Sequence, residues 1–128
     1  MDHKIIGMYR IKNQERWIAK SIESILGVCS EIIILDDGST DKTLEICSKY
    51  DEIVDIHHQE NLPFDETRDK NIMLKMALKR NPEFILTLDG DEILQPNAKN
   101  ILFDELDTLY PETPMYEFQL LNIFDTPT

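Results

Sequence analysis

Short apolar runs alternate with segments of helical periodicity along most of the chain. Apolar residues three and four apart predict helices at 14–26, 41–50, 66–80 and 98–109. Between them, strands are expected at Ile5–Tyr9, Glu31–Leu35, Ile53–Ile56 and Phe84–Leu88, with a further strand at 115–123. The alternation predicts a single α/β domain over residues 1–128, with a mostly parallel sheet and helices on both faces.

Polar residues at the ends of these helices indicate where each helix begins or stops. Asn13 is placed to cap the first helix, Ser39 or Thr40 the second, and Asp65 the long third helix. Pro82 is expected to end that third helix, because proline disfavours a helical conformation in the residue before it.

Two of the expected strands run directly into clusters of carboxylates. The strand ending at Leu35 is followed by Asp36-Asp37-Gly38-Ser39-Thr40-Asp41, and the strand ending at Leu88 by Asp89-Gly90-Asp91-Glu92. Open α/β sheets bind ligands at the carboxyl ends of their strands, so we expect the clusters to lie on neighbouring strands and form one acidic pocket. Carboxylates that lie close together in such a pocket raise each other's pKa or recruit a cation, and their hard oxygen atoms suit Mg²⁺ or Mn²⁺.

Each cluster also has a simpler interpretation. Asp37, Ser39 and Asp41 are typical of a turn that enters a helix, although two consecutive acids exceed what a helix cap needs. Asp89 and Asp91 are separated by one glycine, so both carboxylates can point to one side of the chain. A solvent-exposed acidic turn stays open as the alternative there.

The charge balance narrows the choice of partners. The 128 residues include 13 Lys and Arg against 25 Asp and Glu, and the net charge of −12 repels the backbone of nucleic acids. No stretch approaches the roughly 18 consecutive apolar residues of a membrane span. A cytoplasmic protein is expected, with peripheral attachment at the inner face of a membrane left open. Cys29 and Cys47 lie in apolar settings without a metal-binding spacing and are expected to be buried, reduced thiols.

The two acidic motifs together resemble those of the family 2 glycosyltransferases, which have the Rossmann-like GT-A fold of nucleotide-diphospho-sugar transferases. In addition, Arg10 to Glu15 resembles the family's opening, with Asn13 kept and with Arg10 and Lys12 in place of the usual Pro and Tyr. The segment from Arg68 to Asn71 resembles the family's Arg-Asn segment. The resemblance extends from Ile5 to about Leu94.

The resemblance implies a site for a nucleotide-diphospho-sugar donor. It assigns the base to Asp37, the ribose and metal environment to Asp89, and direct ligation of Mn²⁺ or Mg²⁺ to Asp91. Asp36, the other acid of the first pair, is a further candidate for hydrogen bonds to the base or ribose. A metal that bridges the two phosphates neutralises the charge that builds on the departing diphosphate.

Basic residues of the resembling segments are candidates for the phosphates. Arg10 and either Arg68 or Lys70 are expected to contact them, because a guanidinium forks onto phosphate oxygens. The expected reaction moves the sugar to the hydroxyl of a sugar or lipid-linked acceptor, with inversion, in the synthesis of cell-envelope polysaccharide or lipopolysaccharide.

The catalytic base stays unassigned at this point. In the family it comes from the half of the fold after the metal-binding strand, so we expect a truncated chain that holds the donor-binding half and transfers nothing alone. Later carboxylates are available but no motif selects one: Glu105, Asp107, Glu112, Glu117 and Asp125.

Two other classes of function stay open. A phosphoacceptor receiver domain has a similar length, a parallel sheet and acids at strand ends, although its acid pair follows the first strand rather than the second. The other alternative is a catalytically silent nucleotide-binding module with the same pocket.

Overall fold

The computed structural model describes residues 3–60, 62–108 and 123–124. The expected strands and helices before residue 109 are all present, whereas the strand expected at 115–123 lies outside the described residues except for Ile123. The strands are β1 (Ile5–Ile11), β2 (Glu31–Asp36), β3 (Ile53–His58), β4 (Phe84–Asp89), β5 (Ile93–Leu94) and β6 (Ile123–Phe124). The helices are α1 (Ile18–Ile25), α2 (Thr43–Cys47), α3 (Glu66–Leu78) and α4 (Ala98–Asp107).

The four long strands are parallel and stand in the order β3-β2-β1-β4, which confirms the predicted α/β fold. The expectation that the two acidic strand ends lie on neighbouring strands is wrong. The chain adds β2 and β3 on one side of β1 and then returns to add β4 on the other side, so β1 lies between the two acidic ends.

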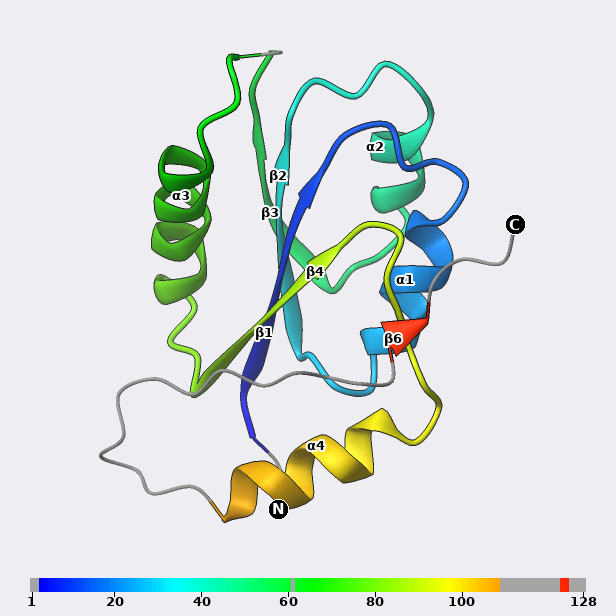
Figure 1. Cartoon of the computed structure of the whole chain (residues 1–128), viewed down its shortest axis with the longest axis vertical. Helices are drawn as coiled ribbons and strands as arrows, with labels where there is room; N and C mark the ends of the chain where they lie inside the picture. The colour runs from blue at the N-terminus through cyan, green and yellow to red at the C-terminus, as the bar shows by residue number, and fades with distance from the viewer. Residues whose placement is uncertain (1–2, 61, 109–122, 125–128) are drawn as a thin grey trace.

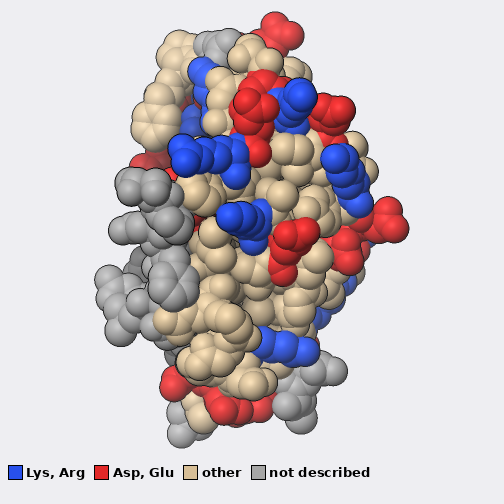
Figure 2. Space-filling model, turned by 90° about the vertical axis from the view of Figure 1, so that its right-hand side faces the viewer, with Lys and Arg blue, Asp and Glu red and all other residues tan. Residues whose placement is uncertain are grey.

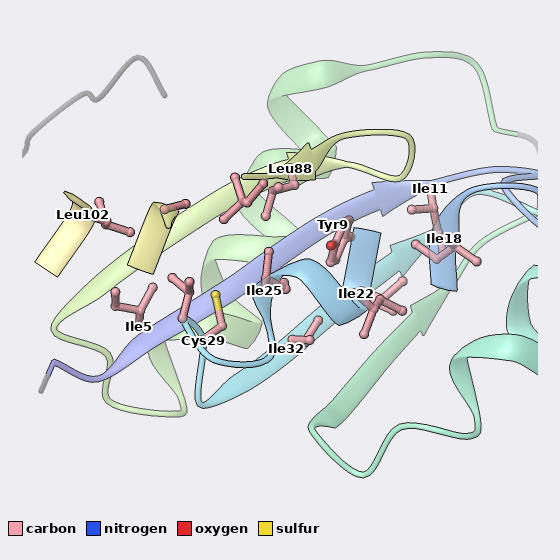
Figure 3. Close-up of a cluster of buried hydrophobic side chains, with 14 of the residues drawn as sticks. Ile5, Tyr9, Ile11, Ile18, Ile22, Ile25, Cys29, Ile32, Leu88 and Leu102 are labelled. Atoms are coloured by element: carbon pink, nitrogen blue, oxygen red, sulfur yellow. The ribbon is translucent and has the colours of Figure 1, made fainter. Parts of the chain in front are cut away.

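Helices cover both faces of the sheet, as expected (Figure 1). Because successive strand side chains alternate, β1 sends Ile5 and Tyr9 toward α1 but sends Ile6 and Met8 toward α3. Figure 3 shows the first of these two cores, in which side chains of β1 meet those of α1. Leu102 of α4 extends this core beyond the sheet.

Both cysteines are free and buried, with 1% exposure each, so the expectation of buried, reduced thiols is confirmed. Burial raises the pKa of the Cys29 thiol to about 12 and the pKa of the Cys47 thiol to about 11. Tyr9, in the same core, is fully buried, and its hydroxyl lies 2.7 Å from Ser21 Oγ. Its polar atom is therefore satisfied inside the apolar layer.

Two of the three expected helix caps are wrong. The cap position of α1 is Trp17 rather than Asn13, and that of α2 is Lys42 rather than Ser39 or Thr40. Asp65 caps α3 as predicted, because its carboxylate accepts a hydrogen bond of 3.0 Å from the backbone N–H of Arg68. α3 ends at Leu78, before Pro82.

The residues expected as caps instead join the β1–α1 loop to the β2–α2 loop. Asn13 Oδ1 accepts from the backbone N–H groups of Thr40, at 2.7 Å, and Asp41, at 3.3 Å. The backbone N–H of Asn13 in turn donates to Ser39 Oγ at 2.9 Å. Tertiary contacts between the two loops thus use the polar groups that the helix ends were expected to use.

The surface of the described residues carries no large basic patch on the side that bears α1. Figure 2 shows that side, where Lys and Arg side chains are interspersed with Asp and Glu. Within the described ranges, none of the helices is both long and apolar enough to span a membrane.

Candidate functional site

The carboxyl edge of the sheet brings together the ends of β1, β2 and β4. Arg10 is the register partner of Asp89 on one side, and Ile11 is that of Asp36 on the other. Between β1 and β4 the order of strands reverses, and open α/β sheets bind ligands in the crevice at such a reversal. Arg10 and Asp89 therefore stand where a fold of this kind takes its ligand.

Asp36 lies beneath this edge and is fully buried. Its carboxylate accepts from the backbone N–H of Ser39, at 3.2 and 3.3 Å for its two oxygens, and also from the Ser39 hydroxyl. His58, at the end of β3, places Nδ1 2.7 Å from Asp36 Oδ2. A carboxylate only accepts, so Nδ1 carries the proton of this bond. Asp36 thereby fixes the turn after β2 against the end of β3.

Asp37 is buried as well, with 6% exposure, but it faces a different set of donors. Arg10 Nη2 donates to Asp37 Oδ2 at 3.0 Å, and Gln59 Nε2 donates to Oδ1 at 3.0 Å. The ring of Phe64 lies over the same guanidinium, with its centroid 5.2 Å from Arg10 Cζ. The structure thus brings together Arg10 and Asp37, two of the residues that the sequence assigned to the donor.

Asp69 joins the same network, although its position in the sequence predicted no role for it. It lies in α3 and is fully buried. Its Oδ2 accepts from Arg10 Nε at 2.7 Å, and its Oδ1 accepts from Gln59 Nε2 at 3.2 Å and from Arg68 Nε at 3.0 Å. These hydrogen bonds hold the pKa of Asp69 below its usual range, although burial opposes them as the largest single influence.

Arg68 reaches the network from the first turn of α3. Its Nη2 also lies 3.0 Å from Asp69 Oδ1, close enough for an ion pair. Among the described residues this nitrogen makes no hydrogen bond, although it is shielded from solvent. The contact at Nη2 is thus electrostatic, whereas the one at Nε is a hydrogen bond. Lys70, the alternative to Arg68, is exposed and pairs with Glu66 at 3.0 Å.

The second acidic motif forms the turn after β4. Asp89 and Asp91 are exposed, and Glu92 folds back so that its Oε1 accepts from the backbone N–H of Asp89 at 2.7 Å. Gly90 is buried against the β1–α1 loop, where a Cβ atom would lie 2.8 Å from Gln14 Cγ. The glycine therefore lets this turn approach the end of β1.

The two exposed carboxylates fit a cation that a diphosphate shares, rather than one that the protein encloses. No group of three or more His, Cys, Asp and Glu side chains within the described ranges is arranged to hold a metal ion. Mg²⁺ commonly takes one or two carboxylates and completes its shell with water and substrate phosphates. Asp89, the register partner of Arg10, and Asp91, two residues further along the same turn, supply two such hard oxygen donors.

The described candidates for a catalytic base lie at the opposite end of the strands. Glu105 and Asp107 belong to α4, and Asp107 Oδ1 lies 2.6 Å from Nε2 of His3, which precedes β1. Figure 1 shows α4 at the end of the sheet away from the β1–α1 and β2–α2 loops. The other three candidates, Glu112, Glu117 and Asp125, lie outside the described residues.

A shallow groove is found elsewhere on the molecule, between α1 and the start of α4. Its walls include Lys20, Gly27, Leu94 and Pro96. None of the donor-site candidates lines this groove, so it is separate from the acidic edge.

Comparison with known proteins identifies the family of this chain. The model of the family described as "Glycosyl transferase family 2" matches residues 10–116, most of the chain. The chain belongs to this family. The match includes both acidic motifs together with Arg10, Arg68 and Asp69. The resemblance drawn from the two acidic motifs is confirmed.

A relative of this chain is a much longer protein. The glycosyltransferase GlyG of Streptococcus pneumoniae is 32% identical over 102 residues, which cover 75% of this chain and 33% of GlyG. The chain thus spans about a third of the length of that relative.

Solved structures share the fold. Residues 1–349 of TarS from S. aureus in complex with UDP superpose with a TM-score of 0.62, at 24% identity over 81% of this chain and 32% of that one. Glucosyl-3-phosphoglycerate synthase from Mycobacterium tuberculosis, in complex with Mn²⁺, UDP and phosphoglyceric acid, superposes with a TM-score of 0.56. Its identity is 23%, over 83% of this chain and 39% of that one. The expected GT-A fold is confirmed.

The sheet order also separates this family member from a receiver domain. Receiver-type folds have the order 2-1-3-4-5, in which the first strand pairs with the third. Here β1 pairs with β4 instead. The architecture therefore disagrees with the phosphoacceptor alternative.

Proposed function

We propose that this chain supplies the donor-binding part of a glycosyltransferase that moves a sugar from a nucleotide diphosphate to an acceptor hydroxyl. The observation that carries the proposal is the joining of Arg10 and Asp37 by a hydrogen bond at the edge where the strand order reverses. The carboxylate proposed to bind the base, Asp37, and the guanidinium proposed to bind the phosphates, Arg10, then lie close enough to contact the same nucleotide.

The network leaves both groups able to serve a nucleotide. Each carboxylate oxygen has two acceptor sites, and Asp37 uses its oxygens for Arg10 and Gln59, so a base N–H can still be accommodated. The Arg10 side chain is 28% exposed, and among the described residues carboxylates engage only its Nε and Nη2. Its other donors suit a phosphate oxygen. Asp36 contributes to the site indirectly, because it holds the turn after β2 and the side chain of His58 in place.

Asp89 and Asp91 would hold the divalent cation, Mn²⁺ or Mg²⁺. Such an ion, when bound, neutralises charge on the leaving diphosphate. The chain's own part is to present the two carboxylates on a turn that Gly90 and Glu92 hold against β1. Support for this assignment comes from the hard oxygen donors and from the Mn²⁺ and UDP named in the complex of glucosyl-3-phosphoglycerate synthase.

Uracil is the proposed base, since the TarS and glucosyl-3-phosphoglycerate synthase complexes both contain UDP. The acceptor is proposed to be a sugar or lipid-linked hydroxyl of the cell envelope, attacked with inversion at the cytoplasmic side of a membrane. The catalytic base is proposed to come from residues beyond the donor-binding part. Nucleic acid is not among the proposed partners, because the net charge is −12.

Calorimetric titration of UDP, GDP and CDP, each with and without Mn²⁺ at fixed ionic strength, tests the proposal without an acceptor. We expect UDP to bind and Mn²⁺ to strengthen its binding. Absence of binding by all three diphosphates under both conditions would refute the donor site.

A further inference from the structure

We propose that Asp69 is a positioning residue of the donor site, which orients the Arg10 and Arg68 guanidinium groups toward the diphosphate. The inference rests on the proposed function and assigns a role to a residue that neither acidic motif contains. Asp69 does not touch the donor; it acts through the two arginines.

The contacts of Asp69 come from three separate parts of the chain. Arg10 belongs to β1, Gln59 follows β3, and Arg68 precedes Asp69 in α3. A fully buried carboxylate is costly unless donors surround it, and here each oxygen accepts at least one hydrogen bond. The side chain thus ties three segments together below the edge of the sheet.

The orientation of the Arg10 guanidinium depends on its contact with Asp69. Asp69 takes its Nε, at 2.7 Å, while Asp37 takes its Nη2, at 3.0 Å. Two hydrogen bonds to different atoms of a planar guanidinium fix the direction of the plane, whereas one bond leaves it free to turn. Asp69 therefore decides which way the remaining N–H groups of Arg10 point.

The net charge of the site distinguishes a positioning role of Asp69 from simple electrostatic attraction between the site and the diphosphate. Asp37 and Asp69 carry two negative charges against the two positive charges of Arg10 and Arg68. Loss of the Asp69 charge would leave the site more positive, and attraction alone would then strengthen the binding of a diphosphate. The positioning role predicts the opposite, because the arginines lose the carboxylate that aims them.

A comparison of UDP with uridine measures the role directly. Uridine has the base and ribose but no phosphate, so its affinity reports on Asp37 and on the integrity of the fold. We expect Asp69→Asn to lower the affinity for UDP about tenfold and to leave that for uridine within about twofold. Asp104→Asn, the same change on the exposed side of α4, is the matched control and should alter neither affinity.

The outcomes are distinct. A UDP affinity that is unchanged or higher in Asp69→Asn would overturn the positioning role, as would an equal loss for both ligands. Should Asp69→Asn not fold by circular dichroism, Asp69→Glu keeps the charge and displaces the carboxylate, and the same selective loss of UDP affinity is expected. Failure of both variants to fold would assign Asp69 to stability alone. Failure of the unchanged chain to bind UDP or uridine would instead refute the proposed function itself.

Discussion

Arg10 and Asp89 are register partners in the parallel ladder of β1 and β4, at the point where the order of strands reverses. Leu88 points into the core beside α1, so strand alternation sends Asp89 toward the opposite face, the one on which Arg10 meets Asp37. A guanidinium and an exposed carboxylate thus flank the same crevice. In the proposed donor site, a diphosphate in this crevice would have the Arg10 guanidinium on one side and the proposed cation-binding carboxylate of Asp89 on the other.

Asp37→Asn should weaken the binding of uridine by about tenfold, because a charge-assisted hydrogen bond to the base is lost. It should weaken the binding of UDP at least as much, because Arg10 also loses the carboxylate partner of its Nη2. This pattern differs from that of Asp69→Asn, which should spare uridine. Calorimetry of both ligands measures it, with Asp104→Asn as the control for a lost surface charge. An unchanged affinity for uridine would show that Asp37 does not bind the base.

Gly90→Ala should lower the free energy of unfolding by about 1–3 kcal/mol, since the new Cβ overpacks the turn. That Cβ would lie 2.8 Å from Gln14 Cγ and 3.1 Å from Ile11 Cγ2. Urea denaturation measures the loss. Gln14→Ala in the same chain removes the closest atom and should restore part of the stability; a double variant no more stable than Gly90→Ala would contradict the contact.

Much of the fold follows from local sequence. The strands are apolar runs, and the long helix α3 carries Met73 and Met76 on one face, so both kinds of element were predictable. The order of strands was not, because the pairing of β1 with β4 joins segments far apart in the chain. Two of the three predicted helix caps were wrong for a related reason: the side chain of Asn13, for example, accepts a hydrogen bond from the backbone of another loop.

The candidate site was predictable only in part. Its motif residues could be named, but Asp36 is paired with His58 of β3, and the partners of Asp37 are Arg10 of β1 and Gln59, which follows β3. Asp69 left one signal that was missed. It occupies the helical face of α3 that Met73 and Met76 share, and a carboxylate in an apolar stripe needs buried partners.

Asn13→Gly and Asn13→Ala should separate two contributions of the loop junction. Both remove the acceptor used by Thr40 and Asp41, at a cost of about 1 kcal/mol. Because Asn13 has a φ of 52°, alanine there should cost about 1 kcal/mol more than glycine. Chemical denaturation of both variants measures the difference. Equal stability of the two would show that the left-handed backbone conformation carries no cost.

His3 should make the stability of the chain depend on pH. Its Nδ1 lies 3.1 Å from Glu83 Oε2, and this hydrogen bond is the main cause of its raised pKa. The same ring holds the pKa values of Glu83 and Asp107 below their usual ranges. A raised histidine pKa gives stability that is complete below the ordinary value of 6.5 and is lost as the pH rises through the folded value. The carboxylates act in the opposite sense and lose theirs as the pH falls through their lowered values.

His3→Gln should therefore reduce the free energy of unfolding more at about pH 5.5 than at about pH 9. The ring also packs edge-on against Phe84 and Phe103, a contribution that is lost at every pH. The difference between the two pH values isolates the charge. An equal loss at both would mean that His3 acts through packing alone.

The most direct test of the central claim is UDP binding with and without Mn²⁺, in the unchanged chain and in Asp91→Asn. If Asp91 and the diphosphate share the cation, Mn²⁺ should raise the UDP affinity of the unchanged chain by about tenfold or more and that of Asp91→Asn hardly at all. The affinities without Mn²⁺ should agree within about twofold. An equal effect of Mn²⁺ on both proteins, or no UDP binding by the unchanged chain, would contradict a metal-assisted donor site at this edge of the sheet.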